Sequence, residues 1–414
     1  MAETEHVLVI GAGIIGTGIA ASLQREGHKV TIIDRLEPGR ACSFGNGGGI
    51  GVTSIPPLST PGVLWKIPRW LLHPEGPLAL RWSHLPVLLP WLARFLRAGS
   101  PERVKAITDA TTAILAPCYD AWAPLFKEAS LEHLVRHSGV IHLYADETAR
   151  DADRYQWRLR EERGLHFERL GQDELRQLVP GLAPDITCAM YEPQWRFVRD
   201  PYLIVKGLAD HVLARGGTIL REDVRGFELG LGGVSTVVTD RGRHKPDRIV
   251  IAAGAWSHRL SRMLGHPVPL ESQRGYHVTM PNAGLDLRHI MMDPGGKMGI
   301  TPMAMGVRFG GTSEFAGVDA PPDYRRAHAL IKRARRLFPN LDATGATEWA
   351  GDRPLLPDSL PVIGPSPRHR NVVYAFGHSH IGMALGGITG KLVAELVAGR
   401  PPSVDLAPYR IDRF

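Results

Sequence analysis

The sequence is poor in cysteine and has no long hydrophobic run. Its 414 residues include three cysteines, Cys42, Cys118 and Cys188, which are widely separated and odd in number. They predict neither a disulfide framework nor a paired-cysteine metal site, so we expect no metal and a reducing compartment. The densest apolar segment, Leu85 to Ala93, is interrupted by two prolines. It is far shorter than the roughly 20 residues of a membrane-spanning helix.

We also expect no secretory leader. Met1 to His6 runs straight into an apolar strand, so we expect a cytoplasmic protein, with the inner face of the membrane as an alternative place of attachment. The composition, 43% hydrophobic and 22% charged, is typical of a folded chain long enough for two domains. The net charge of +7 favours anionic partners: an acidic substrate, an anionic cofactor, a lipid surface or nucleic acid.

The first 34 residues carry the pattern of a βαβ unit. Val7 to Ile10 is a continuous apolar run, as expected of a parallel strand buried on both faces. Apolar residues at four-residue spacing from Ile15 to Leu23 predict a helix that ends at Gly27. A second apolar strand, Val30 to Ile33, ends at Asp34.

Between the first strand and the helix lies the glycine pattern of a dinucleotide site. Gly11 permits a tight turn, Gly13 lets a pyrophosphate approach the backbone, and Gly16 lets helix and strand pack closely. The carboxylate of Asp34 is placed to accept hydrogen bonds from a ribose. The contacts expected here are Gly11, Gly13, Ile14, Ile15, Gly16, Asp34 and Arg35. The pattern does not separate NAD from FAD, because both contain ADP.

Further strands and helices predict a discontinuous nucleotide domain in an α/β (α+β) fold. The segments are a helix at Leu203–Leu213, strands at Thr218–Leu220, Val234–Val238, Ile249–Ala252 and Val372–Phe376, and a helix from Ile381 to Val397 that Gly399 ends. We expect a Rossmann-like domain from residues 1–56, 196–261 and 346–414. Residues 57–195 and 262–345 would form a mixed-sheet second domain, with strands such as Val140–Tyr144 and Gly275–Thr279.

Two other glycine-containing segments are candidates for contact with a flat ligand. The loop Ser43 to Ile50 has a permissive backbone, although such a loop can also be a flexible surface segment. Gly377 to Met383 places His378 and His380 at the start of a helix. With the helix dipole, either histidine could stabilise negative charge on a reduced flavin, or it could serve in capping or packing.

With these residues placed, the sequence resembles the D-amino acid oxidase superfamily of FAD-dependent oxidoreductases, and within it the D-amino acid dehydrogenase branch, which is related to glycine and sarcosine oxidases. The resemblance covers most of the chain. It is carried by Val7–Gly16 with Asp34, Ser43–Gly49, Asp247–Ser257, Arg274–His277, Gly351–Pro354, Asp358–Gly364 and Gly377–His378.

The resemblance implies a noncovalent FAD in an extended pose. Its ADP would bind the glycine pattern, and its isoalloxazine would lie under the Asn46–Gly48 loop and against the last helix. No cysteine matches a covalent flavin attachment segment. The further cofactor contacts expected are Ser43, Asn46, Gly47, Gly48, Val224, Ala253, Gly254, Trp256, Gly377, His378, His380, Ile381, Gly382 and Met383.

The resemblance also implies a carboxylate anchor. The arginine of the Gly-x-Arg-Pro segment maps onto Arg353, whose planar guanidinium can grip a carboxylate and fix the Cα–H over flavin N5. A structural ion pair is the alternative. Tyr276 and His277 cannot both face the pocket from one regular strand, and we favour Tyr276. Arg308 is either a second carboxylate contact or a surface charge. The catalytic set expected is Arg353, Tyr276 and His380, and the substrate contacts are Arg353, Tyr276, His277 and Arg308.

The activity implied is oxidation of a small amino acid, with a bias to the D-enantiomer. The Cα hydride would pass to flavin N5, the imine would be hydrolysed to an oxo acid, and electrons would go to a quinone or another carrier. No side-chain base is expected. One alternative is an oxidase of glycine, sarcosine or a cyclic secondary amine such as D-proline or hydroxyproline, which would use dioxygen. Another is a nucleic-acid-associated flavoprotein, but no nucleic-acid motif is present and we expect no such partner.

Two basic segments have no place in the expected active site. Residues 65–97 hold four tryptophans and five basic residues with a single acid, Glu75. They predict either peripheral contact with lipid headgroups or helices with tryptophan in the core and arginine outside. The segment Arg325 to Phe338 predicts an amphipathic helix with a solvated basic face. The oligomeric state is not predicted.

Overall fold

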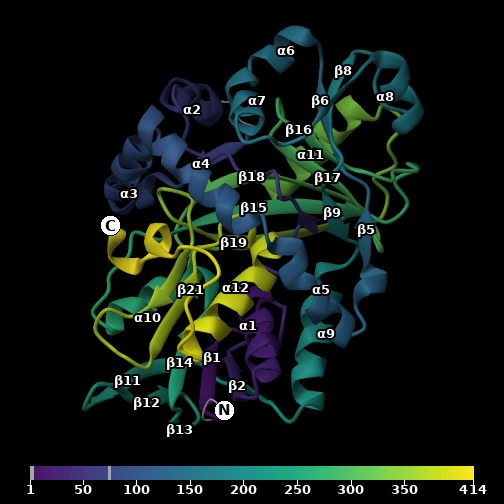
Figure 1. Cartoon of the computed structure of the whole chain (residues 1–414). Helices are drawn as coiled ribbons and strands as arrows, with labels where there is room; N and C mark the ends of the chain where they lie inside the picture. The colour runs from purple at the N-terminus through teal and green to yellow at the C-terminus, as the bar shows by residue number, and fades with distance from the viewer. Residues whose placement is uncertain (1–3, 73–75) are drawn as a thin grey trace.

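The computed structural model describes residues 4–72 and 76–414 (Figure 1). Two large sheets and the helices around them make up this part of the chain. The helices are α1 (Ile14–Arg25), α2 (Val63–Leu72), α3 (Leu85–Ala98), α4 (Pro101–Leu115), α5 (Cys118–Glu128), α6 (Glu147–Asp151), α7 (Arg154–Glu161), α8 (Gln172–Leu178), α9 (Pro201–Ala214), α10 (Ser257–Met263), α11 (Arg325–Leu337) and α12 (Gly382–Val397).

The six-stranded sheet in the lower part of Figure 1 is the predicted Rossmann-like sheet. All neighbouring strands are parallel except the last pair. Helices α1, α9 and α12 pack on one face and α10 on the other, which explains why the central strands are apolar throughout. The strand order is β10 (Thr218–Arg221), β2 (Lys29–Asp34), β1 (His6–Ile10), β14 (Arg248–Ile251), β21 (Val372–Phe376) and β20 (Val362–Pro365).

Close packing of α1 against α12 joins the two ends of the chain. The helices cross where each carries glycine: a Cβ at Gly390 would lie 2.6 Å from the carbonyl oxygen of Gly18. Larger residues would hold the helices apart. The glycine pattern before α1 and the Gly377–Met383 segment before α12 therefore lie at one edge of the sheet, although more than 360 residues separate Gly11 from Gly377.

The nine-stranded sheet in the upper part of Figure 1 is mixed, as predicted. Helix α11 covers one face and buries Ala327, Leu330 and Leu337 against it. The expected strand Val140–Tyr144 has those bounds, and Gly275–Thr279 lies inside β15. The order is β19 (Thr347–Leu355), β15 (Glu271–Met280), β18 (Gly306–Phe315), β17 (Met298–Met303), β16 (Ile290–Asp293), β6 (Val140–Tyr144), β8 (Cys188–Glu192) and β7 (Glu168–Leu170), with β4 (Leu78–Leu80) beside β18.

Two small sheets contain the remaining strands of the described residues. The first is an antiparallel meander of β11 (Val224–Gly230), β12 (Gly233–Thr239) and β13 (Arg243–His244). The second contains β3 (Gly49–Ile50), β9 (Arg196–Val198) and β5 (Val135–His137). The fold class is therefore the expected one, a Rossmann-like domain with a mixed-sheet second domain.

The expected domain boundaries need two corrections. The third nucleotide-domain piece was expected to begin at residue 346, but β19 pairs along its length with β15 in the nine-stranded sheet. Residues 57–195 were expected in the second domain, yet α4 and α5 pack on α1 and α12. Trp122 of α5 donates a hydrogen bond to the carbonyl oxygen of Met383 at 2.9 Å. Local patterns could not reveal either pairing, because both depend on contacts far apart in the sequence.

The tryptophan-rich stretch is divided between core and surface. Trp91 of α3 is 5% exposed and stacks on Phe95, whereas Trp65 of α2 is 86% exposed and Trp82, in the 3-10 helix η1 (Trp82–His84), is 71% exposed. Neither reading of this stretch holds alone. Glu75 and the side chains of Lys66 and Arg69 lie outside the described residues. None of the helices in the described chain combines the length and apolar character needed to cross a bilayer.

Candidate active site

The glycine pattern forms the turn that the sequence predicted. The N–H of Gly11 donates to the carbonyl oxygen of Ile33 at 2.8 Å, and φ at Gly11 is +117°, a conformation that favours glycine. A Cβ at Gly16 would overlap the carbonyl group of Gly11. The N-cap residue Gly13 gives α1 no side-chain cap, so apart from the N–H of Ile14, which donates to Ser43, the N–H groups of its first turn can face an anion.

Asp34 lies beside this turn. Its carboxylate accepts hydrogen bonds from the N–H groups of Ala12 at 2.7 Å and Leu36 at 2.8 Å, and burial raises its pKa. Arg35 stacks on the ring of Trp256 with its guanidinium carbon 3.8 Å from the ring centroid. The expected contacts Val224, Ala253 and Gly254 follow the ends of β10 and β14, at the edge of the sheet where Asp34 ends β2. The structure thus places the expected ADP contacts at one edge.

The loop Ser43 to Ile50, named the second glycine loop, is held by hydrogen bonds at its start and along its middle. Ser43 accepts a hydrogen bond from the N–H of Ile14, which links the loop to the start of α1. Three successive carbonyl oxygens then accept from side chains of the nine-stranded sheet. Gly45 accepts from His277 at 3.1 Å, Asn46 from Arg308 at 2.6 Å and Gly47 from Thr301 at 2.9 Å. The loop is therefore a fixed structure, and the reading of a flexible surface loop is wrong.

The segment before α12 contains two histidines in different roles. His378 is buried and hydrogen-bonded to Thr389 at 3.0 Å, and burial lowers its pKa to about 3. It packs inside the protein, as the alternative reading held. His380 lines the cavity described next and is exposed to it, and the surrounding protein together with the charge of Arg353 lowers its pKa. Both histidines are neutral near pH 7, so neither brings a positive charge to the cavity.

A cavity of about 640 Å³ lies between the second glycine loop and the nine-stranded sheet. Residues of the nine-stranded sheet, of α2 and α3 and of the segment before α12 line it. Arg353, His277, Arg308 and His380, which the sequence singled out, all contribute to its wall. The cavity therefore joins the expected flavin loop to the expected substrate residues.

Arg353 brings an uncompensated positive charge into this cavity. No carboxylate forms an ion pair with it among the residues that the structure describes, and burial lowers its pKa. The group whose charge would oppose that effect is Cys42, a thiol whose own pKa burial raises to about 11. The thiol is neutral near pH 7. The alternative reading of Arg353 as part of a structural ion pair is therefore wrong.

Arg308 is a second buried cation. It is 5% exposed, and burial lowers its pKa to about 10. Its guanidinium donates to Asn46 and, at 3.2 Å, to Thr279. The reading of Arg308 as a surface charge is therefore wrong. Because Arg308, which is buried, and Arg353, which is partly buried, face the cavity without a carboxylate partner among the described residues, the site favours anionic ligands.

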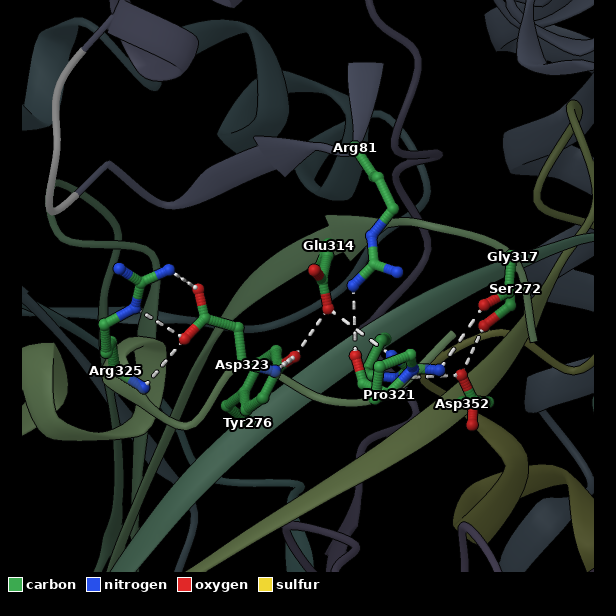
Figure 2. Close-up of polar contacts among 10 residues, drawn as sticks. Arg81, Ser272, Tyr276, Glu314, Gly317, Pro321, Asp323, Arg325 and Asp352 are labelled. Atoms are coloured by element: carbon green, nitrogen blue, oxygen red, sulfur yellow. Dashed lines mark hydrogen bonds and ion pairs between the residues drawn. The ribbon is translucent and has the colours of Figure 1, made fainter. Parts of the chain in front are cut away.

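The preference for Tyr276 over His277 is wrong. Tyr276 points to the opposite face of the sheet, where its hydroxyl donates to Glu314 at 2.5 Å and accepts from the N–H of Asp323 at 2.8 Å, as Figure 2 shows. His277 takes the cavity face and stacks on Trp349, with 5.1 Å between ring centroids. The hydroxyl of Tyr276 is therefore held away from Arg353, although Tyr276 is among the residues that line the cavity.

A bulge in β18 turns the side chain of Glu314 away from the cavity. Arg274 pairs with Glu314 and Tyr276 with Gly311, so β18 has one more residue than β15 between these pairs. The extra residue turns Glu314 toward the α11 side, where it meets Arg274 at 3.5 Å. Simple alternation from Gly310 would have pointed Glu314 into the cavity. The bulge thus keeps this acid away from Arg353 and Arg308.

Three contributors to the site were missed. Trp349 lies two residues before Gly351 on β19, so the alternation of the strand could have placed it on the face of Arg353. Thr301 contacts the loop only through the register of β17 against β18, which has no local signal. Cys42 faces the cavity from the loop region, and its position depends on the fold as well.

The residues present fit FAD. The glycine turn and Asp34 suit its ADP half. In the loop, a Cβ at Gly47 would have no protein atom within 4 Å, so there is space against this backbone for a flat ring. The cavity also carries cations suited to a flavin that becomes anionic on reduction.

Comparison with known proteins agrees with this geometry. Residues 6–396 match the family model described as DAO, FAD dependent oxidoreductase. A D-amino-acid oxidase of Bradyrhizobium diazoefficiens is 39% identical, and the alignment covers 100% of each chain. A D-amino acid dehydrogenase of Paramagnetospirillum magneticum is 33% identical, with 99% of this chain and 98% of that protein covered.

Solved structures show the same fold. A glycine oxidase from Geobacillus kaustophilus superposes with a TM-score of 0.77 at 22% identity and covers 99% of this chain and 100% of its own. An L-proline dehydrogenase from P. horikoshii also gives a TM-score of 0.77, at 21% identity, covering 100% of this chain and 98% of its own. At these identities the likeness concerns the fold alone.

Proposed function

The chain belongs to the DAO family of FAD-dependent oxidoreductases, and from this premise we propose that it oxidises the Cα–N bond of a D-amino acid and passes the electrons to a quinone or another carrier. The family and its named relatives show that the protein is an FAD-dependent amino acid oxidoreductase that acts on CH–NH2 donors. The D-configuration, the noncovalent attachment of FAD, the roles of single residues and the electron acceptor are the proposal.

The observation that carries the proposal is the partly buried guanidinium of Arg353. It faces the cavity beside the second glycine loop and has no carboxylate partner among the described residues. A substrate carboxylate would supply the missing negative charge through two parallel N–H···O bonds. Binding would then fix the Cα of the substrate relative to the cofactor.

The chain's own residues prepare the substrate in three ways. Arg353 binds the carboxylate. The positive charges of Arg353 and Arg308 disfavour a nearby ammonium group, so they lower the pKa of the substrate amine and favour its neutral form. The charge of Arg353 lowers the pKa of His380, so the neutral form of this histidine is favoured beside the arginine. Bound FAD supplies the chemistry of accepting the Cα hydride.

No side chain is assigned as a general base. An amine that binds in its neutral form needs no proton removed before the hydride leaves. Water then hydrolyses the imine product to an oxo acid and ammonia. His277 is also unsuited to the role of base. Its Nδ1–H donates a hydrogen bond to the carbonyl oxygen of Gly45, and burial and the charge of Arg308 lower its pKa to about 3.

The helices around the cavity favour a membrane quinone as the electron acceptor. The inner sides of α2 and α3 line the cavity with residues such as Ile67 and Leu88, while Trp65 and Trp82 project from the surface of the same region. Exposed tryptophans beside arginines suit a lipid headgroup surface. A quinone dissolved in a membrane would therefore have apolar helices between it and the flavin, with the protein held peripherally.

An oxidase that uses dioxygen is the second candidate. It is favoured by the name of one relative, the D-amino-acid oxidase that shares 39% identity over the whole chain. The two candidates share the substrate step and differ only in the acceptor. Glycine, sarcosine and cyclic secondary amines remain substrates to test with this candidate.

Anaerobic reduction of the purified holoenzyme tests the substrate and the acceptor in sequence. D- and L-amino acids, glycine, sarcosine, D-proline and hydroxyproline isomers are added separately, and the flavin absorbance is followed. We expect D-amino acids to bleach the flavin. Slow recovery of colour in air with fast recovery on adding a soluble quinone would support the dehydrogenase, and prompt recovery in air the oxidase. Bleaching by L-amino acids alone would contradict the proposed configuration.

A further inference from the structure

Two glycines sit side by side in the middle of the cavity wall. Gly299 of β17 pairs directly with Gly310 of β18. On either side of them, in the same row across the sheet, Gly310 pairs with His277 and Gly299 with Met292. Residues in one such row share a face, and all four line the cavity. The two central residues of this row, both glycine, therefore present only backbone to the cavity.

The protein itself does not require glycine at these two positions. Neither backbone is in the left-handed region. A Cβ at Gly310 would have its nearest neighbour, the Cβ of His277, at 3.7 Å, and one at Gly299 would have the Sδ of Met292 at 3.5 Å. These are ordinary van der Waals contacts. On the same face, by contrast, a Cβ at Gly275 would overlap Arg353.

Glycine inside a strand has a cost. It weakens the strand by roughly 0.5 to 1 kcal/mol relative to alanine, and it often marks a place where a ligand approaches the backbone closely. Because packing and backbone conformation give no reason for Gly299 and Gly310, the remaining reason is the space above them. That space belongs to the cavity that Arg353 also lines.

We propose that Gly299 and Gly310, together named the glycine floor, form the base of a subsite for the substrate side chain. This subsite selects D-amino acids with bulky apolar side chains, aromatic or branched. The proposal rests on the proposed function and changes one expectation, that of a small amino acid.

The position of the glycine floor suits a substrate anchored at Arg353. The guanidinium lies over Gly275. Gly310 is one strand across from Gly275 and two residues along, because it pairs with His277. With strands about 4.8 Å apart and about 3.4 Å per residue, this separation is roughly 8 Å. A carboxylate at one end and an aromatic ring at the other would span it, whereas a methyl side chain would not reach the glycine floor.

The other walls of the cavity match an apolar side chain. Residues from α2, β4 and α3 present hydrocarbon surface to the same cavity, among them Ile67, Trp70, Leu78, Leu80, Leu88 and Trp91. A ring lying on the glycine floor would bury apolar area on one side against backbone and on the other against these residues. A charged side chain lying against these apolar residues would lose its hydration.

The test fills the glycine floor and compares substrates of two sizes. In the holoenzyme, Gly299→Leu and Gly310→Val place side chains where the ring would lie. The wild type should use D-phenylalanine and D-leucine better than D-alanine, and each variant should lower the ratio of kcat/KM for D-phenylalanine over D-alanine at least about tenfold. Gly226→Val on β11 is the matched control, since no protein atom lies within 4 Å of a Cβ there, and it should leave the ratio unchanged.

Three results would overturn the glycine floor as a side-chain subsite. The first is a wild type that prefers D-alanine, and the second is a fall in kcat/KM of the variants that is equal for both substrates. The third is loss of FAD from the milder variants Gly299→Ala and Gly310→Ala, which would mean that the glycine floor accommodates the flavin. If no D-amino acid reduces the wild-type flavin, the proposed function fails instead. Binding of phenylacetate against acetate, followed by the flavin spectrum in wild type and variants, then tests the glycine floor by itself.

Discussion

The guanidinium of Arg353 on β19 lies over the backbone of Gly275 on the neighbouring strand, in the space that a Cβ at position 275 would occupy. The absence of a side chain at one residue thus sets the position of the charge at the other. A similar relationship holds on the next residues along the strand, where the ring of Trp349 covers Gly351.

Gly275→Ala should therefore impair substrate binding without affecting FAD. The methyl group would displace the guanidinium, the flexible end of a long side chain, while the strand itself remains in place. We expect KM for a D-amino acid to rise about tenfold, the effect of weakening one charge-assisted pair. Steady-state kinetics and the FAD content of the purified protein measure the two effects. An unchanged KM would show that the displaced arginine does not hold the substrate, and Gly226→Ala serves as the control.

Arg308→Met should weaken the binding of FAD. Arg308 holds the carbonyl oxygen of Asn46, and its loss leaves that part of the second glycine loop without one of its three fastenings. A hydrogen bond to a charged group contributes about 1.5 to 3 kcal/mol, so the Kd of FAD should rise about 10- to 100-fold. Titration of apoprotein with FAD by fluorescence measures it. Arg325→Met, which removes an exposed ion pair with Asp323, should leave the Kd as it is.

Stability should fall in mild acid. His378 has its pKa lowered to about 3 by burial, whereas in the unfolded chain it takes up a proton near 6.5. Between these values the unfolded state binds more protons, so the free energy of unfolding decreases as the pH falls from about 6.5 to 3, by at most about 1.4 kcal/mol per pH unit for this residue. Urea unfolding at several pH values measures the slope. His378→Gln, which can still bond Thr389, should flatten it, and an identical slope would contradict the buried neutral histidine.

Thr312→Gly should stabilise the fold. Thr312 lies in the β18 bulge with φ at +56°, which is strained for a β-branched residue and costs of order 1 kcal/mol. Glycine adopts this conformation freely, so we expect the free energy of unfolding to rise by up to about 1 kcal/mol. Ser313→Gly is the matched control, because Ser313 has no positive φ and should lose stability. A destabilised Thr312→Gly variant would mean that the threonine side chain has a stabilising role that outweighs the strain.

Much of the nucleotide domain could be predicted because its signals are local. The apolar run of β1, the four-residue spacing of α1 and the turn at Gly11 each depend on residues within a few positions. The same holds for β21 and α12. These elements formed with bounds within two residues of the expected ones.

The substrate side of the site depends on long-range register, which local patterns do not contain. Tyr276 was favoured over His277 because alternation gives two faces but does not say which one meets the flavin loop. The face of Glu314 could not be predicted either, since a single extra residue at the bulge reverses it. The boundary at residue 346 failed for the same reason: β19 continues the sequence toward the nucleotide domain but pairs with β15.

The most direct test of the central claim, that Arg353 binds the substrate carboxylate at the flavin, is a cycle of two enzymes and two substrates. Wild type and Arg353→Leu are each reduced anaerobically with a D-amino acid and with the corresponding amine that lacks the carboxylate. We expect the wild type to favour the amino acid at least about 30-fold, a charge-paired contribution of about 2 kcal/mol, and the variant to lose this preference while retaining FAD. An Arg353→Leu enzyme that still favoured the amino acid to the same extent would contradict the account.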